Sequence, residues 1–127
     1  MQATLSKKER LKSKKTIEFL FSEGKSVAQY PIRLIYTVGP DTEETNLRAA
    51  VSVSKRNCKK AVDRNHIKRL LRESYRKNKY LVQQQTTQSY NLMILYTGKE
   101  FPSSSRIEKS VMKVLQKFMD REISKSN

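Results

Sequence analysis

The segment from Tyr90 to Thr97 constrains the fold more than any other part of the chain. It contains the longest apolar run, Leu92-Met93-Ile94-Leu95-Tyr96, and it is apolar on both faces that a strand would present. Strands of this kind lie inside a sheet, with other elements covering each face. The run is far shorter than the ~20 residues that a membrane-spanning helix needs. We therefore predict a soluble domain built around one central strand.

Two further segments have the period of a strand. We predict a strand at residues 27–38 with a kink or a sheet edge at Pro31, because proline cannot donate to a ladder. Within it, the side chains that alternate with Arg33, Ile35 and Thr37 are Ile32, Leu34, Tyr36 and Val38. Residues 47–54 alternate more regularly and predict a half-buried strand. Between them, residues 39–46 form a turn or loop that holds the densest acidic cluster of the chain.

Three segments have helical spacing. The first spans residues 13–23 and is followed by Gly24, where we expect a left-handed C-terminal cap. The second spans residues 61–81. The third begins in a serine run, with Ser105 and Glu108 spaced as a capping box. Its apolar stripe consists of Ile107, Val111, Val114, Leu115 and Phe118.

The predicted order is helix, two or three strands, helix, strand, helix. This order favours an α+β fold, a two-layer sandwich in which a mixed sheet packs against helices. We expect a single domain over residues 1–127, with a mobile basic arm at residues 1–15 and a tail at residues 121–127.

The charge of the chain predicts a polyanionic partner. It has 27 Lys and Arg against 12 Asp and Glu, a net charge of +15. Such an excess on one domain is typical of proteins that bind nucleic acid. A single cysteine and a single histidine exclude an internal disulfide and a Cys/His zinc site. The first fifteen residues hold six Lys or Arg and no apolar segment, so we expect no secretory signal and a cytoplasmic protein with no bound metal.

The helix predicted at residues 61–81 carries the most specific pattern. On a helical wheel, Ile67, Leu70, Leu71 and Ser74 share the face that must pack on the sheet. Arg64, Lys68, Arg72, Asn65, Arg69 and Arg76 share another arc, in which we expect no carboxylate. Like charges at i, i+4 repel one another, so an unshielded row favours phosphate binding over a merely solvated face. Four more cations precede the helix: Lys55, Arg56, Lys59 and Lys60.

This stretch resembles the signature of the protein subunit of bacterial ribonuclease P. The family pattern is Arg-Asn, any two residues, Lys-Arg, and an Arg three positions further on. Here it is matched by Arg64-Asn65, Lys68-Arg69 and Arg72. The strand end at residues 51–56 and the short helix that ends near Phe21 also look like the family. The resemblance covers about residues 8 to 120.

The resemblance implies an α-β-β-β-α-β-α fold with a four-stranded mixed sheet and a left-handed crossover. It implies a protein that joins a catalytic RNA and helps it to remove the 5′ leader from precursor tRNA. In that family the RNA performs the chemistry with Mg²⁺ that it mainly holds itself, and the protein supplies no catalytic residue. The implied partners are the ribonuclease P RNA, bound by one monomeric protein, and the leader of precursor tRNA, without DNA or membrane.

The family's site residues transfer to matching positions of this chain. The residues expected to contact RNA are Lys55, Arg56, Lys59, Lys60, Arg64, Asn65, Lys68, Arg69, Arg72 and Arg76. Ile17, Phe21 and Tyr36 match positions that line a leader cleft between the first helix and the sheet. Phe21 has an equally weighted alternative as a packing residue of the first helix.

Three positions depart from the family. His66 stands where an Arg is common, Ile17 cannot stack on a base as a Phe does, and Cys58-Lys59-Lys60 replaces a Gly-containing loop. Three other classes remain as alternatives. They are a self-sufficient protein nuclease, a ribosomal or other structural RNA-binding protein, and an architectural DNA-binding protein.

Overall fold

The computed structural model describes residue 11 and residues 13–39, 47–85 and 88–122. It contains three helices and four strands within this part of the chain. Their order is α1 (Lys14–Glu23), β1 (Lys25–Gln29), β2 (Ile32–Val38), β3 (Leu47–Val53), α2 (Ala61–Gln83), β4 (Tyr90–Tyr96) and α3 (Ser104–Glu122). The predicted turn at residues 39–46 lies almost wholly outside the described residues, as do most of the predicted arm and of the tail.

The four strands form one mixed sheet in the order β1-β2-β4-β3. β2 pairs antiparallel with both β1 and β4, whereas β3 pairs parallel with β4. β4 therefore lies inside the sheet, and six of its seven residues are buried. The predicted central strand is confirmed. α2 makes the crossover that joins the parallel neighbours β3 and β4.

The segment predicted as one strand at residues 27–38 is instead a hairpin of two strands. The chain turns at Tyr30-Pro31, where the peptide bond is cis, and β1 folds back along β2. Pro31 is placed outside the ladder because it has no N–H to donate. Its carbonyl oxygen accepts the Thr97 N–H at 2.7 Å, which joins the hairpin turn to the end of β4.

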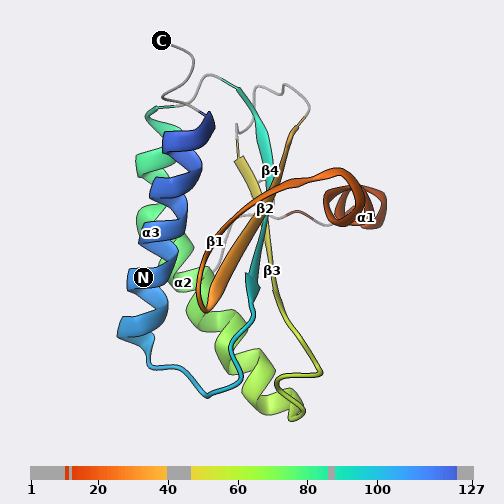
Figure 1. Cartoon of the computed structure of the whole chain (residues 1–127), viewed down its shortest axis with the longest axis vertical. Helices are drawn as coiled ribbons and strands as arrows, with labels where there is room; N and C mark the ends of the chain where they lie inside the picture. The colour runs from red at the N-terminus through yellow and green to blue at the C-terminus, as the bar shows by residue number, and fades with distance from the viewer. Residues whose placement is uncertain (1–10, 12, 40–46, 86–87, 123–127) are drawn as a thin grey trace.

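The main core lies between the sheet and the pair α2 and α3, which cover the same face (Figure 1). This is the predicted two-layer sandwich. All five residues of the predicted α3 stripe are 0% exposed, and Ile67 and Leu71 of α2 are 1% and 0% exposed. The sheet face is made by alternate residues, among them Ile32, Leu34 and Tyr36.

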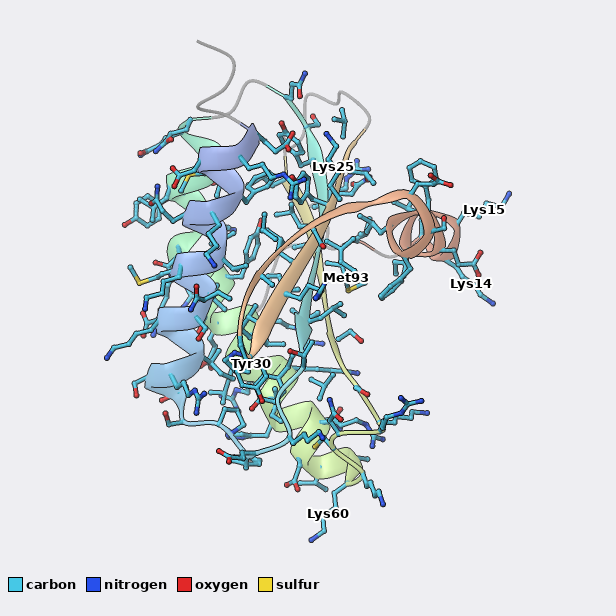
Figure 2. All side chains as sticks on the ribbon, viewed as in Figure 1. Lys14, Lys15, Lys25, Tyr30, Lys60 and Met93 are labelled. Carbon is cyan, nitrogen blue, oxygen red and sulfur yellow. The ribbon has the colours of Figure 1, made fainter. Side chains whose placement is uncertain are left out.

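α1 packs on the opposite face of the sheet (Figure 1). Leu20 and Leu11 are buried there against Met93 of β4, which points toward α1 in Figure 2. Leu11 belongs to the segment predicted as a mobile arm, yet it is 7% exposed and donates its N–H to the Ala49 carbonyl at 2.9 Å. The arm is thus anchored at least at this residue.

Two predicted caps are wrong. Gly24 follows α1 in an extended conformation (φ −71°), not a left-handed one. A glycine is needed at this position because there is no room for a side chain. A Cβ there would lie 2.6 Å from the Ile35 Cγ2 atom. At α3 the capping oxygen comes from Ser103, whose Oγ accepts the Arg106 N–H at 3.2 Å. The helix begins one residue before Ser105, so Ser105 and Glu108 form no capping box.

Candidate nucleic-acid interface

The two faces of α2 separate as the helical wheel predicts. Ile67, Leu71 and Ser74 are buried against the rest of the fold, and Leu70 is partly buried beside them. The signature residues lie on the outer side. Asn65, Arg69 and Arg72 are exposed, whereas Arg64, Lys68 and Arg76 are half-buried. The helix therefore presents cations to solvent over several turns, two of them exposed and three half-buried.

Arg64 also makes hydrogen bonds within the protein that the sequence pattern does not predict. Its guanidinium donates to the carbonyl oxygens of Cys58 and Lys59, at 3.0 and 2.8 Å. Both carbonyls belong to the turn that leads into α2. A planar fork with several donors can hold two carbonyls and still offer N–H groups to an anion. Arg64 thus fixes the path of the chain that carries Lys59 and Lys60.

One carboxylate lies next to the cationic arc of α2, beyond the edge at which the wheel places Arg69. The Arg69 Nε lies 3.3 Å from a carboxylate oxygen of Glu73, one helical turn further on. Arg69 is 71% exposed in this pair, so water screens the contact and it adds little stability. The pair orients Arg69 along the helix, and the other cations of the arc keep the surface strongly positive.

The turn between β3 and α2 extends the positive surface. Ser54 holds the turn through its Oγ, which accepts the Arg56 N–H, and through its carbonyl, which accepts the Cys58 N–H. The Asn57 side-chain amide donates to the Thr97 carbonyl at 3.1 Å. The four cations of this turn are all exposed: Lys55, Arg56, Lys59 and Lys60. Figure 2 shows Lys60 pointing away from the body of the molecule at the start of α2.

α1 presents aromatic side chains on the other side of the sheet. Phe21 is 54% exposed, which excludes the alternative that it is a buried packing residue. Ile17 packs partly against the small cluster beneath α1. Phe19 is 53% exposed, and sequence reasoning missed it because it lies outside the apolar stripe of the helix.

Tyr36 does not lie beside α1, which corrects the cleft predicted from the resemblance. It is 2% exposed in the core between the sheet and α3, where its ring packs edge-on against Phe118 at 4.7 Å. Its hydroxyl donates to a carboxylate oxygen of Glu122 at 2.7 Å. Burial and the Glu122 carboxylate raise the pKa of Tyr36 well above its usual range. The alternation of β2 turns this residue to the face opposite α1.

The residues of β2 that do face α1 are Arg33, Ile35 and Thr37. Arg33 is exposed, and its guanidinium donates to the Ser26 Oγ at 3.3 Å. Its partners across the sheet are Leu95 of β4 and, through Leu95, Ser52 of β3. Ser52 is the second-to-last residue of β3, so this row lies near the end of the sheet at which the turn to α2 begins. The sequence did contain a signal for Arg33. It alternates with the buried residues of β2, so it must face the side of the sheet that α1 covers.

No titratable cluster in the described residues suggests a metal centre. Within residues 11, 13–39, 47–85 and 88–122, no three His, Cys, Asp or Glu side chains lie close enough to hold an ion together. In the same part of the chain, no helix combines the length and apolar character needed to cross a bilayer.

Comparisons with known proteins agree with the signature on α2. The family model described as Ribonuclease P matches residues 5–119. The ribonuclease P protein component of Porphyromonas gingivalis is 37% identical over 114 residues, covering 87% of this chain and 83% of the relative. That of Caldanaerobacter subterraneus is 38% identical over 109 residues, covering 84% and 87%.

Solved structures share the fold. The RNase P protein of Staphylococcus aureus superimposes with a TM-score of 0.67 at 22% identity, covering 91% of this chain and 96% of the other. The RNase P protein of Thermotoga maritima gives a TM-score of 0.69 at 21% identity, covering 86% and 96%.

Proposed function

The chain belongs to the ribonuclease P protein family, and we propose that it binds the catalytic RNA through α2 while the 5′ leader of precursor tRNA lies beside α1. It acts as the accessory subunit of an endonuclease that produces mature tRNA 5′ ends. The RNA supplies the chemistry, and the protein supplies affinity and position.

One observation carries this proposal: a single surface holds the cations of α2 and of the preceding turn. Most of them are exposed, and α2 keeps them together at a cost in mutual repulsion. Phosphates along the helix would offset that repulsion and release their condensed counterions. Arginine is suited to this task because its fork matches phosphate oxygens in two places.

The proposed leader site rests on α1 and the row of sheet residues beside it. Phe21 is exposed and can stack on an unpaired base, a contact worth ~1–3 kcal/mol in single-stranded RNA complexes. Ile17 offers an apolar contact, and Arg33 offers a cation for the leader phosphates. Tyr36 has no part in this site because its ring is enclosed in the main core.

Mg²⁺ belongs to the RNA in this proposal. Cationic side chains dominate the surface of α2 and its preceding turn, and they repel a divalent cation. RNA phosphates supply the oxygen ligands that Mg²⁺ prefers, and no catalytic residue is assigned to the protein. We propose a complex of one protein with one RNA in the cytoplasm, without DNA.

A reconstitution experiment tests the function. The protein is mixed with a ribonuclease P RNA at low Mg²⁺ concentration, and cleavage of precursor tRNA is followed. We expect the protein to accelerate cleavage. A protein that binds the RNA without stimulating it would be a structural RNA-binding protein. Cleavage by the protein alone would identify a self-sufficient nuclease.

The leader contact is tested with Phe21→Ala in the reconstituted complex. We expect the affinity for precursor tRNA to fall by about 5- to 150-fold, the range for loss of one stacked base, and the affinity for mature tRNA to stay. Tyr80→Ala is the matched control, because Tyr80 is 51% exposed on α2, away from α1. Equal losses for both tRNAs in Phe21→Ala would remove the leader assignment.

A further inference from the structure

A pocket of about 290 Å³ lies between α2 and the connection from β4 to α3. In Figure 1 this connection runs beside the first half of α2, at the end of the molecule where α2 begins. Its volume is at the lower limit of the roughly 300–1,000 Å³ of pockets that enclose drug-sized ligands. It suits a group of one or two rings. Its lining includes Lys59, Lys60, Asp63, Lys99, Glu100 and Phe101.

Two aromatic rings are stacked at this pocket. The rings of His66 and Phe101 lie 5.3 Å apart at an interplanar angle of 23°. His66 is itself exposed, and Phe101 is 58% exposed although it is one of the most apolar side chains of the chain. One side of the Phe101 ring is occupied by His66, and more than half of the residue still meets water. A planar partner placed on it would remove that surface from water.

The surroundings hold the pocket in shape. The Asn57 amide bonds the Thr97 carbonyl at 3.1 Å, which ties the turn before α2 to the connection after β4. The Tyr96 hydroxyl donates to the Glu100 carbonyl at 2.6 Å. Gly98 is buried between them, and a Cβ there would lie 2.7 Å from the Tyr96 Cζ atom. Little ordering is therefore required when a ligand enters.

The charged groups around the pocket select the kind of ligand. Lys59, Lys60 and Lys99 are exposed and suit a phosphate. Asp63 and Glu100 line the same pocket, and a carboxylate accepts hydrogen bonds from the exocyclic amino group of a base. A ring platform, three cations and two acceptors together match a nucleotide better than they match a simple anion or an apolar ligand.

We propose that this pocket binds one unpaired nucleotide of the RNA subunit, with its base on Phe101 and its phosphate on the three lysines. The inference rests on the proposed function and adds a contact outside the cationic arc of α2. Bases that carry an exocyclic amino group bind more tightly than uracil. His66 is a positioning residue, because it supports the ring that meets the base.

The chain has no tryptophan, so Phe101→Trp introduces a unique fluorescent probe at the pocket. We expect the emission of this variant to fall when the ribonuclease P RNA binds. Met112→Trp, at a position of α3 that is 45% exposed, is the control whose emission changes little. Short single-stranded oligoadenylate is expected to quench Phe101→Trp more strongly than oligouridylate does.

A substitution series separates stacking from packing. Phe101→Tyr keeps a planar ring and should keep the affinity for the ribonuclease P RNA, whereas Phe101→Leu and Phe101→Ala should lose about 5- to 150-fold. Thermal unfolding shows whether each variant is folded. If Phe101 only packs on the fold, Phe101→Leu should bind the RNA like the wild type, and the inference is then overturned.

The outcomes distinguish the two proposals. An unchanged emission of Phe101→Trp, in a complex whose formation is verified by filter binding, overturns the nucleotide pocket alone. In that case stimulation of precursor cleavage by the wild-type protein would continue. Failure of the wild-type protein to bind the ribonuclease P RNA at all would overturn the proposed function, and the pocket would fall with it.

Discussion

Tyr36 links the stability of the fold to pH through its burial and one partly buried hydrogen bond. Its hydroxyl donates to Glu122 at 2.7 Å, and burial with the nearby carboxylate raises the pKa of Tyr36. A raised pKa means that the stabilisation is complete below the ordinary tyrosine value of about 10 and is lost as pH rises above it. We expect Tyr36→Phe to cost about 1–2 kcal/mol at neutral pH and to flatten the loss of stability in alkali.

Urea unfolding from neutral pH to about pH 11 checks this expectation. Burial also raises the pKa values of Tyr90 and Tyr96, so the wild type and Tyr36→Phe must be compared with each other and not with a flat line. Tyr80→Phe, at an exposed site, should follow the wild type. Parallel plots of the free energy of unfolding against pH for Tyr36→Phe and the wild type would show that the contact of Tyr36 with Glu122 does not link stability to pH.

The same residue shows what a sequence can and cannot predict. Period two correctly placed Ile32, Leu34 and Tyr36 on one buried face. It cannot tell which helix covers that face, because both faces of the inner sheet are packed. The resemblance placed Tyr36 beside α1, and the register of β2 excludes this. The hydrogen bonds from Arg64 to the preceding turn could not be predicted from the sequence either, since they depend on tertiary geometry.

At the scale of elements, the start of α3 tests the corrected cap. The Ser103 Oγ accepts the Arg106 N–H, whereas Ser105 is already inside the helix. We expect Ser103→Ala to lower the free energy of unfolding by about 1 kcal/mol, as for other N-cap serines. Ser105→Ala is the matched control and should change it by only a few tenths of a kcal/mol, or slightly stabilise the helix. The reverse ranking in urea unfolding would restore the capping box.

The cationic arc of α2 is tested by its salt dependence. The double substitution Lys68→Ala and Arg72→Ala leaves the turn before α2 intact, because Arg64, which is unchanged, donates the hydrogen bonds to the carbonyl oxygens of that turn. We expect the slope of log affinity for the ribonuclease P RNA against log salt to shrink by about 1.4–1.8, or 0.7–0.9 for each phosphate contact. Lys109→Ala with Lys113→Ala removes the same charge from α3 and should leave the slope unchanged. Equal changes would mean a general effect of net charge.

Most of the helices and strands were predictable from the sequence, and the hairpin of β1 and β2 was the main exception. α1, β3, α2 and β4 lie within two residues of their predicted bounds, because each has an apolar pattern and packs where that pattern points. The residues alone predicted one strand where β1 and β2 form a hairpin, because β-forming side chains continue on both sides of Pro31, and only the resemblance implied a third strand before α2. Gly24 was misread because glycine allows close packing as well as left-handed turns, and the sequence does not say which is needed.

At the scale of the whole molecule, the described residues form two apolar clusters of unequal size on the two faces of one sheet. The larger one joins the sheet to α2 and α3, and it carries the proposed contacts with the RNA subunit on its outer side. The smaller one contains Leu11, Leu20 and Met93 and holds α1, where the leader is proposed to lie. The stability of α1 can therefore change without loss of the rest of the fold, because small peripheral units open locally.

Leu20→Ala tests this separation. Leu20 is 0% exposed, and truncating such a residue in a rigid core costs about 2–5 kcal/mol. α1 can open while the main core stays folded, so truncating Leu20 cannot lower the free energy of unfolding by more than the free energy that holds α1 in place. We therefore expect Leu20→Ala to destabilise the protein less than Leu115→Ala in the main core does. Hydrogen exchange should show lost protection in α1 and retained protection in β4. In the reconstituted complex, discrimination between precursor and mature tRNA should weaken while affinity for the RNA subunit stays. Loss of both together would mean that the sheet couples its two faces into one cooperative unit.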